Sequence, residues 1–213
     1  MNEHKFQAQK NLAQTMIHNL QKRNMEGYFV PTRQEAVSLI MERFLTAGKT
    51  VSFGGSMTLA ESGLMDAVRK GSCVLYDRTL AKTPEEVRRM KADMSNSDYF
   101  LMSTNAITVD GELVNIDGTG NRVCYLCYGP ENVIVLAGMN KVVSSVEDGV
   151  RRVRDIASPP NTVRLGKHTP CASTGRCGDC YSEDCICSQI VITRRSGIKN
   201  RIKVVLVAEE LGY

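Results

Sequence analysis

The chain has 213 residues, of which 42% are hydrophobic, and a formal net charge of +4. This length suits one large domain or a domain with an attached segment. No window is long and apolar enough to span a bilayer, and the N-terminal residues lack the apolar region of a signal peptide. The basic residues form no stripe with interleaved aromatic residues. We therefore expect a cytoplasmic protein with no membrane span and no nucleic-acid partner.

The first segment, residues 1–27, is predicted to contain an amphipathic helix. Between Lys5 and Arg23 the apolar residues recur at three- and four-residue spacing, which places them on one face of a helix. We expect this face to pack on the core or on a second subunit, with a homodimer as the favoured outcome. A short strand over residues 28–30 follows, and then a helix from about Thr32 to about Gly48.

Residues 50–65 are predicted to form the end of a buried strand, a glycine turn and the start of a helix. The glycines at 54 and 55 permit a tight turn and bring peptide N–H groups close to a ligand. Thr58 and Glu61 have capping-box spacing, which predicts one helix from about Thr58 to about Lys70. Such a turn is suited to a phosphate or a carboxylate. An ordinary strand-to-helix turn would use the same glycines for geometry alone.

The rest of the chain continues the alternation of strands and capped helices. We predict strands over residues 73–76, 98–103, 132–137, 189–193 and 202–207, a hairpin over 107–115 with a type I′ turn at Asp110-Gly111, and helices beginning at Thr83 and at Ser145. Pro159-Pro160 is expected to close the last of these helices. The alternation predicts an α/β fold with a largely parallel sheet flanked by helices. Residues 28–160 would form the core, 161–188 a cysteine-rich segment, and 189–213 the strands that complete the core.

Three segments follow predicted strands, namely Gly54–Ser56, the segment after Ser103 and the segment after Ala137. Because ligands of parallel sheets bind beyond the carboxyl ends of the strands, we expect these segments to share one crevice. The predicted ligand-binding residues are Gly54, Gly55, Ser56, Asp117, Gly118, Gly120, Asn121, Arg122, Asn140 and Lys141. Arg122 would clamp a carboxylate or phosphate bidentately, and Lys141 would add a cation. A glycine loop with a surface ion pair would explain the same residues without a ligand.

The sequence identifies no catalytic residue. The three histidines lie in the first helix or near the cysteines, away from the predicted crevice. Acid–base chemistry would have to rest on Asp117 or on Glu61, and the second of these is already explained as a capping residue. Whether the protein is an enzyme is therefore left open by the residues themselves.

Five of the eight cysteines crowd into residues 171–187. Without a secretion signal, such clustering favours metal binding or redox chemistry over a disulfide framework. Cys177 and Cys180 have the two-residue separation that lets both thiolates reach one tetrahedral centre. The spacing does not choose between zinc and an iron–sulfur cluster, and a set of free or regulatory thiols is the alternative. Cys124 and Cys127 have the same separation but are interpreted as packing residues of a helix or strand.

These segments together resemble the lactate-utilisation (LUD) domain family of bacteria and archaea, in particular a short stand-alone branch with a C-terminal cysteine-rich segment. The resemblance covers nearly the whole chain and rests on FGGSMTLAESGL, on NAITVDGELVNIDGTGNRVCYLCYGPENVIVLAGMNKVV, on TPCASTGRCGDCYSEDCIC and on the closing VVLVAEELGY. In the pattern of this branch, four cysteines match Cys171, Cys177, Cys180 and Cys187, and Cys185 occupies a place where arginine is usual. The resemblance therefore implies a metal centre on the first four.

The resemblance also implies the fold shared by ribose-5-phosphate isomerases, glucosamine-6-phosphate deaminases and CoA transferases. It implies a link to the oxidation of L-lactate to pyruvate, in which LUD proteins act with iron–sulfur partners. The sequence departs from these enzymes at two motifs, so the resemblance implies their fold but not their activity. The Ser-Glu-Asn-Gly motif that supplies the catalytic glutamate of a CoA transferase is absent, and so is the aspartate-rich motif of the sugar-phosphate isomerases.

Three functions follow as expectations. The first is a LUD-domain protein that binds a small anionic metabolite and contributes to the oxidation of lactate or another organic acid, with an electron-transfer centre at the cysteines and an iron–sulfur oxidoreductase as partner. The second is an enzyme acting on a sugar phosphate or an acyl-CoA. The third is a non-catalytic sensor or assembly subunit with a structural zinc site. Iron with labile sulfide would favour the first, and zinc the third.

Overall fold

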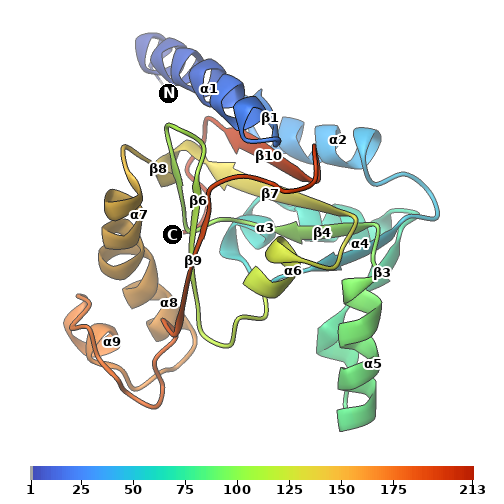
Figure 1. Ribbon diagram of the computed structural model, residues 1–213, viewed down its shortest axis with the longest axis vertical. Coiled ribbons are helices and arrows are strands. Elements are labelled where there is room, and N and C mark those ends of the chain that lie inside the picture. Colours follow the sequence, from blue (N-terminus) through green and yellow to red (C-terminus); the bar gives the residue numbers. More distant parts are fainter. Residues whose placement is uncertain (1) are drawn as a thin grey trace.

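The computed structural model describes residues 2–213 and contains a main sheet with a second, smaller sheet beside it (Figure 1). The main sheet consists of β1 (Glu26–Val30), β2 (Thr50–Phe53), β3 (Val74–Tyr76), β4 (Tyr99–Met102), β7 (Asn132–Gly138) and β10 (Ile202–Val207). These six strands are all parallel and run in the order β1-β10-β7-β4-β2-β3. The predicted α/β class with a largely parallel, helix-flanked sheet is confirmed, and the arrangement is consistent with a ribose-5-phosphate-isomerase-like fold.

Strand β7 illustrates how the sequence specifies the interior of this sheet. Val133 and Val135 belong to the hydrophobic cluster on one face, whereas Ile134 and Leu136 belong to the cluster on the other. Successive side chains of a strand point to opposite faces, so a strand that is covered on both sides is apolar at every position. The continuous run NVIVLA therefore marks an interior strand of the sheet.

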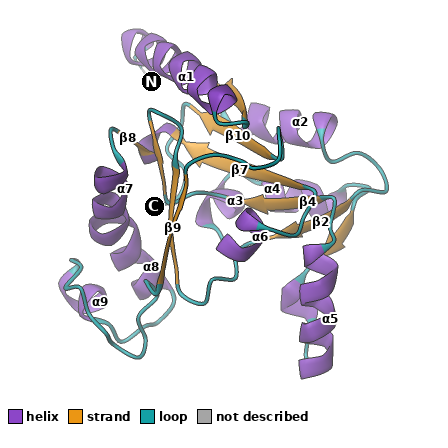
Figure 2. Ribbon diagram, viewed as in Figure 1, coloured by secondary structure: helices purple, strands orange, loops and turns teal. Residues whose placement is uncertain are grey.

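Helices cover both faces of the main sheet (Figure 2). One face carries α1 (Glu3–Lys22), α5 (Pro84–Ser95) and α6 (Val123–Cys127), and the other carries α2 (Arg33–Arg43), α3 (Met57–Glu61) and α4 (Leu64–Lys70). A 3-10 turn, η1 (Arg78–Leu80), follows β3, and another, η2 (Met139–Lys141), follows β7. Among residues 2–213, no helix combines the length and apolarity that crossing a bilayer requires.

Helix α1 buries its apolar stripe within its own chain. Ala13, Met16 and Leu20 are fully buried in the cluster that α1 shares with the main sheet. The Asn19 side chain also donates a hydrogen bond to the carbonyl oxygen of Val109, at 3.1 Å. A second subunit is not required to cover this stripe, and the homodimer stays a prediction.

The smaller sheet consists of β5 (Ala106–Thr108), β6 (Leu113–Asp117), β8 (Val142–Val143) and β9 (Gln189–Thr193), in the order β8-β5-β6-β9. β9 pairs antiparallel with β6. The two C-terminal strands thus belong to different sheets, β9 to the smaller sheet and β10 to the main sheet. One side of the small sheet is covered by α7 (Val146–Arg152) and by the π-helical segment η3 (Val153–Ala157), and α8 (Ser158–Arg164) packs on η3. Helix α9 (Pro170–Thr174) follows in the cysteine-rich segment.

The helix predicted to run from Thr58 to Lys70 is two short helices instead. Ser56 is the N-cap of α3, and its Oγ accepts a hydrogen bond from the N–H of Leu59. The chain then breaks at Gly63, whose φ of +78° suits glycine, and α4 begins. Thr58 does not cap the helix because its hydroxyl is used in tertiary contacts with Leu211 and Lys141.

Two other local predictions are wrong. The turn at Asp110-Gly111 is not type I′, which needs positive φ at both central residues. Only Gly111 has a positive φ, of +92°. Pro159-Pro160 does not close a helix, because both prolines lie in the first turn of α8. That position tolerates proline because the first-turn N–H groups have no intrahelical acceptor.

We expect Leu20→Ala to destabilise the protein by about 3 kcal/mol, because it leaves a cavity in a fully buried site. Leu20 lies against two glycines, where added Cβ atoms would stand 3.0 Å (Gly27) and 3.3 Å (Gly111) from its side chain. Urea unfolding measures the change. Leu80→Ala is the matched control, since Leu80 is 71% exposed and its truncation should change stability by less than about 0.5 kcal/mol. Equal effects would contradict the packing of α1 described above.

Candidate functional site

A crevice of about 290 Å³ opens where the parallel strands end. Its walls include segments that follow β2, β3, β4, β6 and β7, together with η3 and α8. Seven of the ten predicted residues line it, namely Gly55, Ser56, Asp117, Gly118, Asn121, Arg122 and Lys141. The structure thus brings together segments that are far apart in the sequence. Contact of these residues with a ligand stays a prediction.

The other three predicted residues support the crevice without lining it. Gly54 donates its N–H to the sheet, and a Cβ there would stand 2.8 Å from Cγ of Arg122. Gly120 has a φ of +79° and donates its N–H to the Asp117 carboxylate. The Asn140 side chain bonds the backbone at residues 211 and 212. All three therefore position neighbouring groups.

Lys141 is a buried cation that has no carboxylate partner. It is 4% exposed, and its Nζ donates hydrogen bonds to Thr58 Oγ1 at 2.9 Å and to Ser103 Oγ and Thr104 O at 3.3 Å. Across residues 2–213, no Asp or Glu lies within ion-pair distance of this amine. Burial, followed by two nearby arginine charges, lowers the pKa of Lys141 to about 7. A bound anion would supply the missing counter-charge.

Arg122 is held more firmly by the protein than the sequence indicates. Its Nε donates to Asp117 Oδ2 at 2.9 Å, and its Nη2 donates to Asn105 Oδ1 and to the Ile116 carbonyl oxygen. Within the described chain, Nη1 is the guanidinium nitrogen left for a ligand. A bidentate clamp through Nε and Nη2 is therefore excluded while the pair with Asp117 is intact.

The N-terminus of α3 contributes little positive charge to the crevice, because the helix has only five residues and its macrodipole is correspondingly small. The turn before it contributes backbone donors instead. Among residues 2–213, the N–H of Gly55 has no acceptor, whereas that of Gly54 bonds Leu101 O at 2.9 Å.

Sequence reasoning missed the lining residues Arg78, Asn161 and Arg164. Ser103, Thr104 and Asn105 lie at the strand end that was predicted to reach the crevice, but they were not named individually. Arg78 follows β3, and its Nη2 would stand 3.4 Å from a Cβ placed on Gly55. Ligands of parallel sheets bind beyond the carboxyl ends of the strands, and this rule would have identified Arg78 if it had been applied to the strand predicted over residues 73–76. Arg164 had no such signal, because it reaches the crevice from α8.

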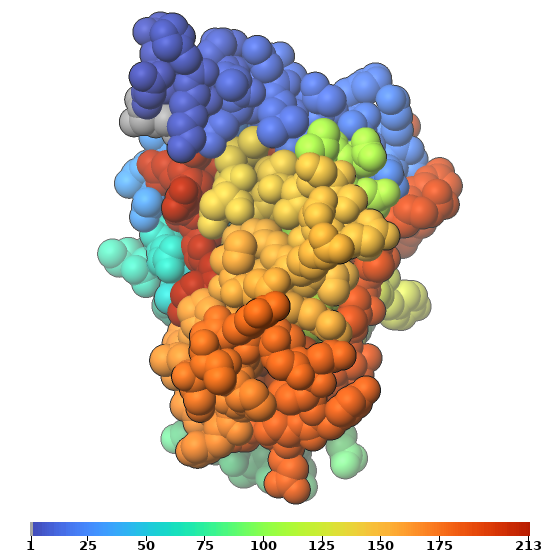
Figure 3. Space-filling view, turned by 90° about the vertical axis from the view of Figure 1, so that its left-hand side faces the viewer, coloured from blue at the N-terminus to red at the C-terminus, as the bar shows by residue number. Residues whose placement is uncertain are grey.

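A second, smaller cavity of about 50 Å³ is lined by all five clustered cysteines, Cys171, Cys177, Cys180, Cys185 and Cys187. It lies in the segment that Figure 3 shows in orange on the surface below α7. Cys171 is buried, with its Sγ 3.2 Å from Thr169 Oγ1. Cys187 lies 3.3 Å from Ser158 Oγ, and burial raises the pKa of its thiol, with the neighbouring thiols adding to the effect.

The donor set of this cavity fits a thiolate metal centre. All five thiols are free, and the Asp179 N–H donates to Cys177 Sγ at 3.4 Å, a bond of the kind that tunes metal-bound sulfur. Among residues 2–213, no three His, Cys, Asp or Glu side chains stand close enough to hold an ion without moving. The cavity does not separate Cys185 from the other four cysteines. Metal binding by Cys171, Cys177, Cys180 and Cys187 therefore stays a prediction.

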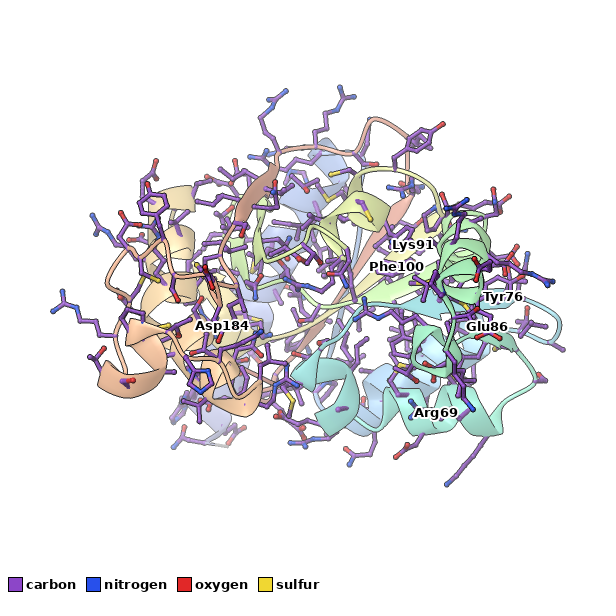
Figure 4. All side chains as sticks on the ribbon, turned by 90° about the horizontal axis from the view of Figure 1, so that it is seen from below. Arg69, Tyr76, Glu86, Lys91, Phe100 and Asp184 are labelled. Carbon is purple, nitrogen blue, oxygen red and sulfur yellow. The ribbon has the colours of Figure 1, made fainter. Side chains whose placement is uncertain are left out.

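Two acidic side chains beside the cysteines, Asp179 and Asp184, are already paired. Asp179 forms an ion pair with Arg154 at 3.0 Å. Asp184 accepts hydrogen bonds from the His168 N–H and from Lys167 Nζ, and these bonds hold its pKa at about 2. Figure 4 shows Asp184 on the cysteine-rich segment, at the end of the molecule opposite Glu86 on α5. The Asp179–Arg154 pair links the segment to η3, whereas the contacts of Asp184 lie within the segment.

Cys124 and Cys127 are not packing residues. Both lie on α6, as one of the sequence interpretations proposed, but both are exposed. The buried residues of α6 are Val123, Tyr125 and Leu126. The apolar neighbours of the two cysteines in the sequence thus face the core, and the thiols face away from it.

The fold and the crevice define a parallel α/β protein with a cationic pocket at the carboxyl edge of its sheet. The chain belongs to the LUD domain family, whose family model matches residues 13–207. A crystal structure of a DUF162 family protein from Deinococcus radiodurans is similar in fold, with a TM-score of 0.54, 13% sequence identity, and coverage of 93% of this chain and 96% of that chain. No curated protein matches the chain significantly.

Proposed function

We propose that this LUD-domain protein binds a small anionic metabolite in the crevice and contributes to the oxidation of lactate or another organic acid. The observation that carries the proposal is Lys141, a buried ammonium group that lines the crevice without a counter-ion. Four cationic side chains and one carboxylate line the same crevice, so its charge is positive overall. Burying a charge without a partner is unfavourable, and an anionic ligand would compensate it.

The electron-transfer part of the proposal concerns the cysteine cavity. Four thiolates would hold an iron–sulfur cluster, which would supply one-electron chemistry when bound. The oxidoreductase partner would exchange electrons with this centre. Support comes from the convergence of five thiols on one cavity and from the family, and metal analysis with assay of labile sulfide tests it.

One observation favours a second candidate, an enzyme acting on a sugar phosphate or an acyl-CoA. A lysine whose pKa is about 7 can both give and take a proton near neutral pH, as general acid–base catalysis requires. Turnover of ribose 5-phosphate or of an acyl-CoA by the purified protein would support this candidate over the first.

Gly55→Val is expected to abolish anion binding because its side chain would occupy the crevice beside Arg78. Thermal shift and calorimetry would be run with inorganic phosphate, L-lactate, pyruvate, ribose 5-phosphate and acetyl-CoA. A compound at about 100 times its Kd should stabilise the wild type by about 2.7 kcal/mol. Gly197→Val is the matched control, since a Cβ at Gly197 meets no atom within 4 Å. Absence of binding by every compound, or equal affinity of the Gly55→Val variant, would contradict the proposal.

A further inference from the structure

The crevice and the cysteine cavity share a wall. Ser158 and Ile186 line both of them. Ile186 lies between Cys185 and Cys187 in the sequence. The thiols of these two cysteines line the cysteine cavity, and Ile186 itself also lines the crevice. The two sites are therefore separated by a single layer of residues.

Three contacts tie this layer to the crevice. A Cβ added at Gly118, in the crevice, would stand 3.5 Å from the Ile186 Cα and 3.6 Å from its carbonyl oxygen. The Cys187 thiol and the Ser158 hydroxyl lie 3.3 Å apart. Cys187 also packs on the small hydrophobic cluster that includes Val153, another residue of the crevice wall.

We propose that residues 185–187 form a movable wall between the two cavities, through which metal binding at the cysteines and anion binding in the crevice strengthen each other. This inference rests on the proposed function. Within residues 176–188 the structure has no helix or strand. A metal bound by the cysteines would hold this loop in place, and with it the Ile186 wall.

The coupling is reciprocal by thermodynamic necessity. If the metal-bound form has the higher affinity for an anion, then the anion-bound form has the higher affinity for the metal by the same factor. The segment is suited to this role because few apolar contacts order it, so that either ligand can shift its equilibrium. The two ligands need not touch each other for the effect to occur.

Gly118→Val tests the shared wall without changing a cysteine. The φ of Gly118 is not positive, so the backbone accepts valine. The added Cβ would already be in van der Waals contact with Ile186, and the two further methyl groups have to be accommodated beside this residue. Metal-free protein would be titrated with Co²⁺, and the thiolate-to-cobalt absorption would be followed. We expect Gly118→Val to weaken Co²⁺ binding at least about tenfold. Gly55→Val, in the crevice but away from the cysteine segment, should bind Co²⁺ as the wild type does.

The second arm measures the affinity for inorganic phosphate with and without bound Zn²⁺. Tighter phosphate binding by the zinc-loaded protein supports the inference. Unchanged Co²⁺ affinity in Gly118→Val, equal weakening by Gly55→Val, or phosphate binding that ignores zinc would each overturn it. A further outcome is that Gly118→Val binds Co²⁺ more weakly and Gly55→Val does not, while neither the zinc-free nor the zinc-loaded protein binds phosphate. This outcome would support the shared wall and contradict the proposed anion site. Circular dichroism of both variants checks that they fold.

Discussion

Replacing Cys180 with serine is expected to release the bound metal and to loosen residues 171–187. Four thiolate bonds to structural zinc contribute binding free energy on the order of 10 kcal/mol, and the segment has little else to order it. Its one helix, α9, has only five residues, and all five cysteines line its cavity. Metal content by elemental analysis, with limited proteolysis of the loop, measures the effect.

Cys185→Ser is the sharpest comparison, because Cys185 lines the same cavity but falls outside the predicted ligand set. We expect this variant to keep its metal and its resistance to proteolysis. Cys73→Ser, in the segment before β3, controls for the loss of any one thiol. Protein purified anaerobically without zinc or iron, or equal metal loss from the Cys180 and Cys185 variants, would contradict the assignment.

Lys141→Met should weaken anion binding by about tenfold, which corresponds to about 1.4 kcal/mol, since it removes a buried positive charge from the crevice wall. The reason is that methionine fills the same buried space without the positive charge. Calorimetry with the compound found in the screen gives the affinity. Lys203→Met is the matched control. Lys203 is also buried, but it lies near the amino-terminal end of β10, whereas the crevice opens at the carboxyl ends of the strands. Similar losses from both variants would argue against an anion contact at Lys141.

The same lysine predicts two pH dependences of opposite sign. The pKa of Lys141 is about 7 in the folded chain, compared with the ordinary value of 10.5 that applies to the unfolded chain. Between these two pH values the unfolded chain therefore binds more protons than the folded chain. The free energy of unfolding of the ligand-free protein should therefore rise by about 2 kcal/mol from pH 7 to pH 9. Anion affinity should fall over the same interval as Lys141 loses its charge. Lys141→Met should abolish both trends, and a wild-type protein whose stability and affinity stay flat would contradict the assignment.

The nature of the metal separates the candidate functions. Iron with labile sulfide supports an electron-transfer centre and the oxidation of an organic acid, whereas zinc supports a sensor or assembly subunit with a structural site. Asp179 and Asp184 are paired with basic side chains, and these pairs offset part of the negative charge beside the cysteines.

The sequence by itself predicted the α/β class and the edge of the sheet where the crevice opens. These features follow from local patterns. The run NVIVLA requires a strand covered on both faces, and alternating helices and strands require a parallel sheet. In such a sheet the segments after the strands meet at one edge, so the glycine turn at Gly54 and the turn at Lys141 could be assigned to one site before any contact was known. The loop at Asp117 follows β6 of the smaller sheet, and it is the packing of that sheet that brings the loop to the crevice.

Only the tertiary structure decided which partner each of these groups finds. Thr58 has the spacing of a helix cap, yet its hydroxyl accepts from Lys141, 83 residues away in the chain. The sequence predicts a strand over residues 189–193, and folding pairs this strand with β6 of the smaller sheet. Arg122 donates hydrogen bonds to Asp117, Asn105 and Ile116. Ile186 lines both cavities. Local patterns report the conformation of a few neighbouring residues, whereas the burial of a charge and the choice of its partner depend on segments that only folding brings together.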